Sequence, residues 1–384
     1  MSVQALVTAD NHLDPTAAGF SYRRYDRRRD HLLCFEEVMK YAEQNRPDIL
    51  LVAGDLFDSV RPSNHSRARL MQDFKSLSEK GIKIFLVSGH HDTPKSVEEG
   101  VSPLAVYGNS GYAVFFQNPS EPTKAKMKIG QLELSVLGLS YNPLLQARQD
   151  PLTGLDLRAE GDIRIFVTHY PIEGFSGCAA DEAVIKLSSF PQDFQLITAG
   201  HIHRYQKKQL GDAVILIPGS TERTSFQEED DEKGFVWLEI LKKGVSSIEH
   251  IRTPARRYKT LTVEWPIQGD TLEVLKKIVE EYSDLDSVLR LRLRGKVTTE
   301  QLAGYRRADL LAYAENKYFH FSVDDGELVI ESPEPLEALP LTTPLEELRR
   351  YFASLMENSS EEEVRILRDA LNLAEAKLKE AGAW

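Results

Sequence analysis

The chain has 384 residues, 41% of them hydrophobic and 28% charged, and its formal net charge at pH 7 is −12. This length allows two or three domains with sizeable cores, and the composition is typical of a globular protein. The negative charge argues against a protein that coats nucleic acid by electrostatic attraction alone.

The sequence also indicates a cellular compartment. No apolar run approaches the roughly 18 residues that a membrane-spanning helix needs, so we expect no membrane partner. The two cysteines, Cys34 and Cys178, stand in unrelated contexts and predict no disulfide framework. A reducing cytoplasm is therefore the expected location.

Five short polar signatures each follow a β-branched, apolar run that predicts a buried strand. In chain order they are Asp10-Asn11-His12, Gly54-Asp55-Leu56-Phe57-Asp58, Gly89-His90-His91-Asp92, Thr168-His169 and Gly200-His201-Ile202-His203. Helical patterns at 27–45 and 67–80 separate the first three runs and predict βαβ units. Ligand groups in such folds gather at the carboxyl ends of the strands, so we expect the five signatures to meet. Later apolar runs indicate a second sheet packed on the first.

The pattern changes after residue 252, which ends the predicted catalytic domain. Residues 253–330 predict a small α+β module, and residues 331–342 are acidic and proline-rich, as expected of a linker. Residues 343–384 predict two helices with capping boxes that begin at Thr343 and Ser360. Their apolar stripes could pack on the protein itself or dock the helices of another chain.

Asp and His are the side chains that hold divalent metals in catalytic sites. The strand ends supply Asp10, His12, Asp55, His169, His201 and His203. We expect Asp55 to bridge two ions, because the preceding Gly54 allows a close turn. A two-metal site polarises a phosphoryl oxygen and activates a water for attack on phosphorus.

The third signature supplies a candidate acid for the leaving group. His91 suits this role, since an imidazole titrates near neutral pH. Asp92 stands beside it and could hold the orientation of the ring and favour its protonated form. Both residues are therefore predicted to be catalytic.

As a set, the signatures resemble the motif series of the calcineurin-like metallophosphoesterase superfamily, D-x-H, G-D-x-x-D, G-N-H-D, H and G-H-x-H. With the segments 54–63 (GDLFDSVRPS) and 217–223 (IPGSTER), the chain is similar to SbcD-type nucleases of DNA double-strand-break repair over about residues 1–330. The resemblance implies an α/β fold with a two-sheet αββα sandwich, a small α+β capping domain and a C-terminal helical pair.

The same resemblance implies an activity and an assembly. It implies a manganese-dependent nuclease that acts 3′ to 5′ on duplex ends and endonucleolytically on single strands or hairpins. It also implies a homodimer whose C-terminal helices bind an SbcC-like, SMC-family ATPase.

The resemblance further assigns two ligand sets that share one residue. They are Asp10, His12, Asp55 and His203 for one ion, and Asp55, His90, His169 and His201 for the other. The family has Asn where this chain has His90, so a nitrogen ligand replaces an oxygen ligand. We expect His90 to bind metal and the site to accept Zn²⁺ or Fe²⁺ beside Mn²⁺.

A basic cluster follows the first signature and includes Arg23, Arg24, Arg27 and Arg28. These side chains could contact DNA phosphates or form a solvated helix start. The nearby Tyr22 and Tyr25, with Tyr107, could stack on frayed bases or cover edges of the core.

Two other functions stay open at this point. A phosphoesterase for small molecules or phosphoproteins would use the same metal core, and a scaffold with a metal site could have lost activity through His90. The module at 253–330 and the terminal helices favour a macromolecular substrate, DNA, and a protein partner.

Overall fold

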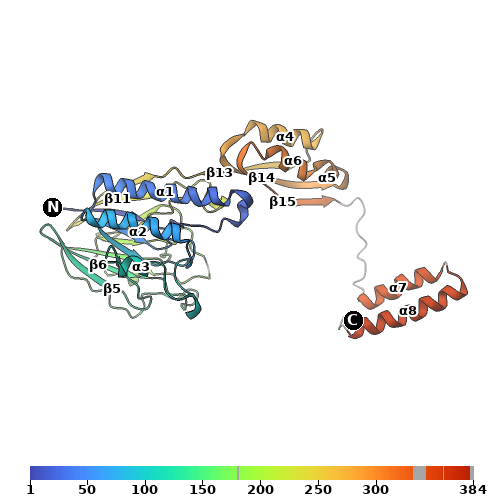
Figure 1. Ribbon diagram of the computed structural model, residues 1–384, viewed down its shortest axis with the longest axis horizontal. Coiled ribbons are helices and arrows are strands. Elements are labelled where there is room, and N and C mark those ends of the chain that lie inside the picture. The colour runs from blue at the N-terminus through green and yellow to red at the C-terminus, as the bar shows by residue number, and fades with distance from the viewer. Residues whose placement is uncertain (180, 332–342, 358, 381–384) are drawn as a thin grey trace. The chain divides into compact units, whose positions relative to one another are not determined.

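The computed structural model of the chain describes residues 1–179, 181–331, 343–357 and 359–380 (Figure 1). The chain forms two compact units, Met1–Arg294 with Arg306–Glu327, and Gly295–Tyr305 with Leu328–Trp384. The predicted linker lies outside the described residues except for residue 331, and the domain boundaries read from the sequence stay predictions. Among the helices of the described part, none is both long and apolar enough to span a membrane.

The first sheet is built mainly from strands near the N-terminus. Its strands are β1 (Val3–Thr8), β2 (Ile49–Ala53), β3 (Lys83–Val87), β4 (Val114–Phe115), β11 (Gly234–Leu241) and β12 (Gly244–Arg252). Their order is β12-β11-β1-β2-β3-β4. The strands β1 to β4 are parallel, and β11 and β12 add an antiparallel edge.

The second sheet also has a parallel centre, with an antiparallel strand at each of its two edges. Its strands are β5 (Thr123–Ile129), β6 (Leu132–Leu139), β7 (Ile163–Thr168), β8 (Leu196–Ala199), β9 (Gln206–Leu210) and β10 (Ala213–Ile217). Their order is β5-β6-β7-β8-β10-β9, and β6, β7, β8 and β10 are parallel. The strands β1, β2, β3, β7 and β8 therefore each end within a parallel part of a sheet.

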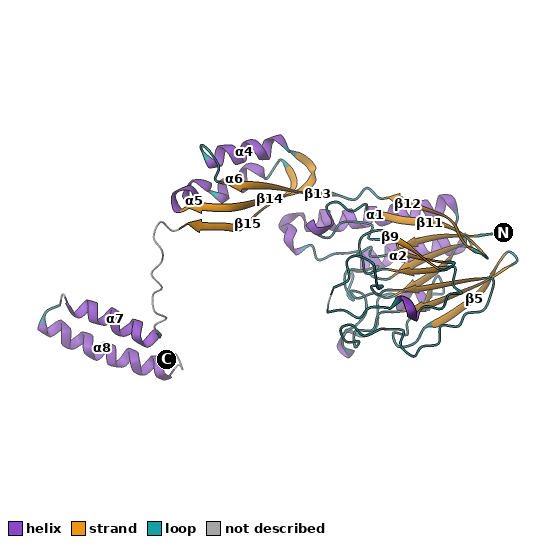
Figure 2. Cartoon of the chain, turned by 180° about the vertical axis from the view of Figure 1, so that it is seen from behind, coloured by secondary structure: helices purple, strands orange, loops and turns teal. Residues whose placement is uncertain are grey.

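The two sheets pack face to face, which confirms the predicted two-sheet fold (Figure 2). Val7 and Leu51 of the first sheet share this central core with Val136 and Val167 of the second. Side chains alternate between the faces of a strand, so Leu6 points to the opposite side. There the helices α1 (Arg24–Asn45) and α2 (Asn64–Glu79) cover the first sheet. Because both faces are covered, the central strands are continuous apolar runs.

The outer face of the second sheet has a different cover. Phe166 and Ile197 on that face pack against Tyr170, Phe190 and Phe194, which lie in connecting segments. The regular structure in these described segments is the short 3-10 helix η3 (Leu187–Ser189). The remaining short helices are η1 (Ala18–Arg23), η2 (Val97–Glu99), α3 (Ala105–Asn109) and η4 (Phe226–Glu228).

A third, smaller sheet follows, as the sequence predicts for an α+β module. Its order is β13-β14-β15, and its elements are β13 (Arg257–Trp265), α4 (Thr271–Glu281), β14 (Asp284–Thr298), α5 (Thr299–Tyr305), α6 (Arg307–Ala314) and β15 (Tyr318–Glu331). Tyr258, Val288 and Phe319 form a small core with Phe20 and Phe226. This core joins the third sheet to the segment before α1 and to η4.

The C-terminal helices α7 (Pro344–Glu357) and α8 (Glu361–Glu380) contact each other as a pair. Thr343 and Glu346 exchange hydrogen bonds between side chain and backbone, which confirms the first capping box. Arg349 on α7 binds Glu375 on α8 with a nitrogen–oxygen distance of 2.7 Å. The predicted C-terminal helical pair is thus present in the structure.

Candidate metal centre

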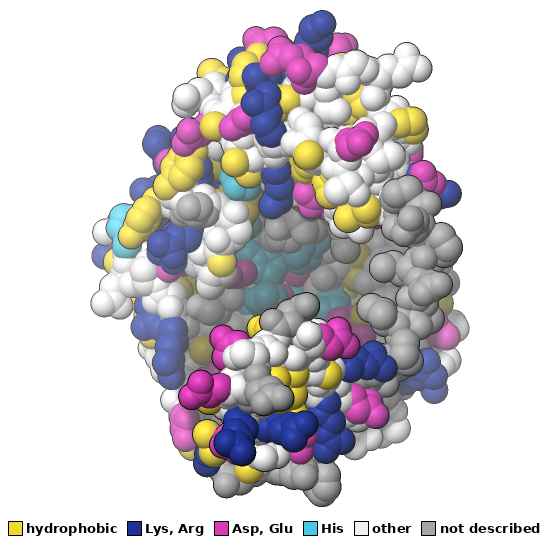
Figure 3. Space-filling view, turned by 90° about the vertical axis from the view of Figure 1, so that its right-hand side faces the viewer, with side chains coloured by type: hydrophobic (Ala, Val, Ile, Leu, Met, Phe, Trp, Pro, Cys, Tyr) yellow, Lys and Arg dark blue, Asp and Glu magenta, His cyan; other side chains and the backbone are white. Residues whose placement is uncertain are grey.

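The signatures that follow β1, β2, β3, β7 and β8 come together where these strands end. Three overlapping groups of side chains have ligand atoms that all lie within 4.8 Å of one another. The groups are Asp10, His12 and His203, then His12, Asp55 and His91, and then Asp10, Asp55 and His169. Histidine side chains gather in one region of the face shown in Figure 3, with acidic side chains beside them. Asp10, His12 and Asp55 each belong to two groups, and of these the carboxylates of Asp10 and Asp55 are groups that can bridge two ions.

The backbone is bent sharply at four of these positions. Asp10, His12, Asp55 and His201 have φ values of 49°, 44°, 47° and 81°, in the left-handed region that non-glycine residues seldom adopt. Such conformations cost of order 1–3 kcal/mol each and persist where the surrounding structure enforces them. Here each bend turns the chain just after a strand, and the side chains of Asp10, His12 and Asp55 belong to the ligand groups.

Three glycines make room around one buried histidine. A Cβ atom on Gly54, Gly89 or Gly200 would collide with the ring of His169, and on Gly89 also with the carboxylate of Asp55. The glycines that open three of the signatures are therefore required by the close approach of strand ends to this ring.

Hydrogen bonds fix which nitrogen of His169 can bind a metal. Its Nδ1 lies 2.7 Å from the Ala53 carbonyl, which can only accept, so Nδ1 carries the proton. The buried Nε2 has no hydrogen-bond partner in the described structure and lies 3.1 Å from Asp55 Oδ2 and 3.8 Å from Asp10 Oδ1. A lone pair aimed between two carboxylates fits a divalent ion, and the ring is oriented as in metal-binding histidines.

A second pair of ring nitrogens gives the same indication. Nε2 of His12 lies 3.1 Å from Nε2 of His203. Two nitrogens that bind one ion at about 2.1 Å are about 3 Å apart. Glu228 Oε1 lies 3.1 Å from Nδ1 of His203 and orients that ring from behind.

The electrostatics of the site favour a bound cation. Burial opposes the charged form of His12, but Asp58, Asp55 and Asp10 together outweigh it and raise the pKa of His12 to about 9. Burial also opposes the charged form of His169, and Asp55 and Asp10 outweigh it and raise its pKa to about 10. The carboxylates therefore attract protons to the rings unless metal ions supply the positive charge.

Comparison with known proteins identifies the family. The family model for calcineurin-like phosphoesterases matches residues 4–205, which is more than half of the chain. The chain is a calcineurin-like phosphoesterase.

Several archaeal relatives carry the name DNA double-strand break repair protein Mre11. The phosphoesterase is 28% identical to the one from Methanococcus maripaludis over 74% of this chain and 75% of the relative. It is 23% identical to the one from Sulfurisphaera tokodaii over 97% of this chain and 94% of the relative. The resemblance inferred from the motifs is confirmed, and the phosphoesterase is a metal-dependent enzyme of this fold.

Two predicted ligands of the phosphoesterase lie outside the three groups. Nε2 of His90 lies 3.2 Å from Lys95 Nζ, and Nε2 of His201 lies 3.0 Å from Glu182 Oε2. Burial, with the Lys95 cation beside the ring, lowers the pKa of His90 to about 4. The backbone of His201 helps to hold Asp10 in place, because its N–H donates to Asp10 Oδ1 at 2.9 Å. Binding of metal by these two side chains stays a proposal.

The surroundings of His91 differ from the sequence prediction. Its side chain is 42% exposed, and its Nδ1 lies 3.1 Å from the Asp58 carbonyl and 3.7 Å from Asp58 Oδ1. Asp92 is buried, and its carboxylate accepts backbone hydrogen bonds from Gly89, Leu56 and Phe57. Asp92 therefore holds the second and third signatures together, and the acid that faces the His91 ring is Asp58.

The sequence interpretation assigned no role to three carboxylates that contact site histidines. Asp58 closes the second signature, and the family pattern G-D-x-x-D marked it. Glu182 and Glu228 stand in connecting segments without such a signal. Lys233, whose side chain is fully buried, lies 2.6 Å from Glu228 Oε2 and fixes that carboxylate in turn.

The basic cluster divides into a buried and an accessible part. The prediction that Arg27 contacts DNA is wrong in this structure, because the residue is 1% exposed and its guanidinium binds Asp30 and the Arg223 carbonyl. Arg23 and Arg28 are partly exposed and Arg24 is exposed, so these three can still meet a phosphate.

The tyrosines considered for base stacking divide in the same way. Tyr107 is fully buried and packs near Phe57 and Phe74, so it belongs to the core. Tyr22 and Tyr25 are 64% and 76% exposed. Only these two remain accessible to a base among the three tyrosines.

Proposed function

We propose that this phosphoesterase is the nuclease subunit of a DNA double-strand-break repair complex. It would cut phosphodiester bonds 3′ to 5′ from duplex ends and endonucleolytically in single strands and hairpins. The observation that carries the proposal is the set of three overlapping ligand groups, in which two carboxylates are shared and an exposed histidine stands at the edge. The similarity to relatives named for DNA repair over nearly the whole chain supports it.

The residues of the centre would have two roles, metal binding and proton transfer. Two divalent ions, when bound, would polarise the phosphate and lower the pKa of a water. Asp55 would hold both ions, with Asp10, His12 and His203 on one ion and His90, His169 and His201 on the other. His91 keeps its Nδ1 proton on the Asp58 carbonyl, so Nε2 is left to give a proton to the leaving oxygen.

We also propose that the helices α7 and α8 dock an SbcC-like, SMC-family ATPase. Leu348 and Leu371 are half-buried within the helical pair. In contrast, Tyr351, Ile366 and Leu373 are 61%, 66% and 65% exposed, and such apolar side chains suit a helical partner. The sequence has no phosphate-cradling P-loop, so a partner would have to hydrolyse ATP. A homodimer in the cytoplasm is part of the same proposal.

Incubation of the purified chain with Mn²⁺ and DNA tests the activity. Duplexes labelled at one 5′ end, single strands and hairpins are offered beside a His91→Ala control. We expect shortening from 3′ ends and opening of hairpins, both lost in the control. Hydrolysis of a chromogenic phosphodiester without cleavage of any DNA would instead indicate a small-molecule or phosphoprotein phosphoesterase. Bound metal without either activity would indicate a scaffold.

Metal titration tests the centre itself. We expect two ions per chain at saturating Mn²⁺, and a single ion would contradict the two-metal assignment. A His90→Asn variant restores the oxygen ligand of the family pattern. If His90 binds metal, the variant should gain affinity for Mn²⁺ relative to Zn²⁺. If the ratio of Mn²⁺ to Zn²⁺ affinity is the same in the variant and the unaltered chain, His90 does not bind metal and keeps its contact with Lys95.

A further inference from the structure

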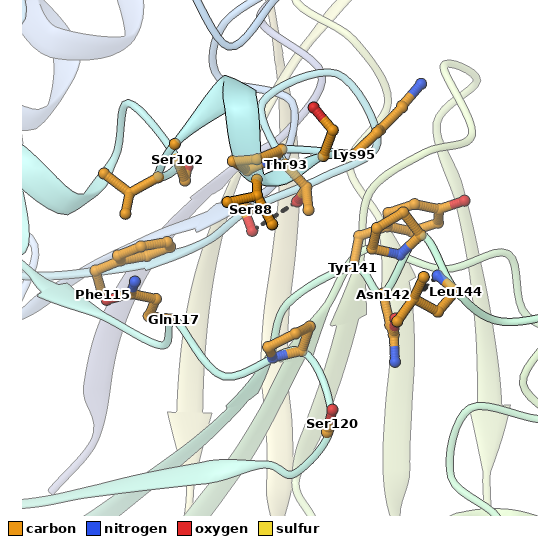
Figure 4. A pocket seen from close by; sticks show the side chains of 17 residues that line it. Ser88, Thr93, Lys95, Ser102, Phe115, Gln117, Ser120, Tyr141, Asn142 and Leu144 are labelled. Carbon is orange, nitrogen blue, oxygen red and sulfur yellow. Dashed lines mark hydrogen bonds between the residues drawn. The ribbon is translucent and has the colours of Figure 1, made fainter.

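A pocket of about 440 Å³ lies next to the third signature (Figure 4). Its lining comes from residues 88–102, which follow β3, from the segment 115–120 and from the turn 141–144. Binding sites for small molecules have volumes of roughly 300–1,000 Å³, so the pocket can take a ligand of nucleoside size.

The lining suits a flat, mostly apolar ligand. The rings of Phe115 and Tyr141 contribute to it (Figure 4). Around them stand Val97, Val101 and Leu144, which are 97%, 64% and 84% exposed. Apolar side chains gathered at a hollow mark a binding site more often than single exposed ones do.

The lining also offers hydrogen bonds for the edge of such a ligand. Asn142 accepts the Leu144 N–H through Oδ1, which directs its amide N–H groups elsewhere. Gln117 lines the pocket as an exposed side chain. The hydroxyls of Thr93 and Ser88 bind each other at 2.9 Å in its inner wall (Figure 4). Unpaired bases are bound by stacking on aromatic rings and by hydrogen bonds to their edges.

Ring contacts connect the lining of the pocket to the third signature. The Tyr141 ring lies against the His90 ring with centroids 5.2 Å apart, and His90 lies against His91 at 5.3 Å. Lys95 lines the pocket and places Nζ 3.2 Å from His90 Nε2. A cation therefore stands between the pocket and the residue proposed to protonate the leaving group.

We propose that this pocket receives an unpaired base of the DNA strand, from a nucleotide that flanks the phosphate to be cut. Lys95 would contact the phosphate and the pocket would hold the base. Binding of this one nucleotide would position the phosphodiester bond to be cut beside His91. This inference rests on the proposed nuclease function and names its substrate more closely as an unpaired nucleotide at the cleavage site.

The experiment uses short single strands with one ordinary phosphodiester among methylphosphonate linkages, so that one bond can be cut. The nucleotides that flank this bond carry bases in one strand and are abasic in the other. We expect the chain to cut the first strand about tenfold faster or more, because stacking of a base is worth roughly 1–3 kcal/mol. Equal rates for the two strands would overturn the inference.

Two variants connect this preference to the pocket. Ser120→Trp adds a ring at an exposed position of the lining, and it should lower the rate on the base-bearing strand to the abasic rate. Ser247→Trp adds the same ring to an exposed serine of β12 and should keep the preference. Leu144→Ser removes part of the rim and should reduce the preference, whereas Leu33→Ser, at an exposed position of α1, should not. A full preference in both Ser120→Trp and Leu144→Ser would overturn the inference.

All four variants should keep the melting temperature and the bound Mn²⁺ of the unaltered chain, which shows that they fold and keep the centre. Hydrolysis of bis(p-nitrophenyl) phosphate by the unaltered chain separates the possible failures. If the unaltered chain hydrolyses it but cuts neither strand, the nuclease function fails and the pocket inference fails with it. If both strands are cut alike, the nuclease function stands and the pocket inference alone is wrong.

Discussion

The Asp58 carboxylate lies 3.2 Å from Nδ1 of His12. The same oxygen is 3.7 Å from Nδ1 of His91, so one acid lies beside the ring proposed to bind metal and the ring proposed for proton transfer. An acid behind a histidine ligand fixes the tautomer and raises the basicity of the nitrogen that binds the ion.

Replacing Asp58 by Asn tests this relationship. The amide keeps the size of the side chain and removes its charge, so we expect Mn²⁺ affinity to fall about 10- to 100-fold. Isothermal titration with Mn²⁺ measures the change. Asp193→Asn, which breaks a surface ion pair with Arg164, is the matched control and should bind as the unaltered chain does. Equal affinities in both variants would show that Asp58 does not support His12.

We expect Arg27 to contribute to the stability of the fold and not to the binding of DNA. Its guanidinium lies 3.6 Å from the buried carboxylate of Glu222, and burial already raises the pKa of that carboxyl. Arg27→Met leaves Glu222 without its cation, so the free energy of unfolding should fall by about 3–5 kcal/mol. Denaturant titration checks this, and a loss below about 1 kcal/mol would contradict it.

Arg24 is exposed, so its replacement should have the opposite effects to the replacement of Arg27. Arg24→Gln should change the free energy of unfolding by less than about 0.5 kcal/mol, as surface substitutions usually do. If Arg24 meets a phosphate, the slope of log affinity against log salt should become shallower by about 1. Fluorescence anisotropy with a duplex at several salt concentrations measures it. An unchanged slope would leave Arg24 as a solvated residue.

Stability should depend on pH through His31. Burial, with the Arg27 cation beside the ring, lowers the pKa of His31 from 6.5 to about 3. Below pH 6.5 the unfolded chain takes up a proton that the folded chain refuses, so His31 makes the folded state less stable as pH falls toward 3. The loss is about 1.4 kcal/mol per pH unit in that window.

The variant His31→Gln isolates this contribution. Gln keeps a donor for the Asn11 carbonyl, which lies 3.2 Å from His31 Nδ1, and does not titrate. Denaturation midpoints between pH 7 and pH 5 should therefore fall less steeply for the variant than for the unaltered chain. Parallel curves would mean that His31 is not held neutral.

Gly89→Ala should damage the centre without any change of charge. The added methyl would collide with Asp55 and His169, whose positions are fixed by neighbouring strands. We expect binding of the ion at the Asp10, Asp55 and His169 group to be lost, and metal analysis after dialysis detects it. Gly19→Ala adds a methyl in open space and should bind the full amount. Full binding by Gly89→Ala would show that the strand ends can move apart.

The candidate ligands were predictable because their signal is local. An apolar run followed by Asp or His marks the end of a buried strand, and parallel strands end at one edge of a sheet, so Asp10 and Asp55 could be placed together without a structure. Glu228 and Glu182 gave no such signal, since only the folded chain brings them to His203 and His201. The direction of the His90 ring toward Lys95 is likewise a result of packing that the sequence pattern does not contain.

The burial of Arg27 had a signal in the sequence, but the neighbouring arginines outweighed it. It stands four residues before His31 and eight before Phe35, at helical spacing on the stripe that α1 buries. The surrounding arginines favoured a solvated or DNA-binding face instead. Burial of a cation becomes predictable only when its partner Glu222 is known to lie opposite.

The left-handed backbone at Asp10, His12, Asp55 and His201 also bears on the kinetics of the metal centre. Because packing around the strand ends holds these bends, the backbone there would keep its shape while one ion replaces another. We therefore expect exchange of one ion for another to be limited by dehydration of the ion and release of ligands, and not by reorganisation of the protein. Such an enzyme could follow changes in the supply of metals while its scaffold stays assembled.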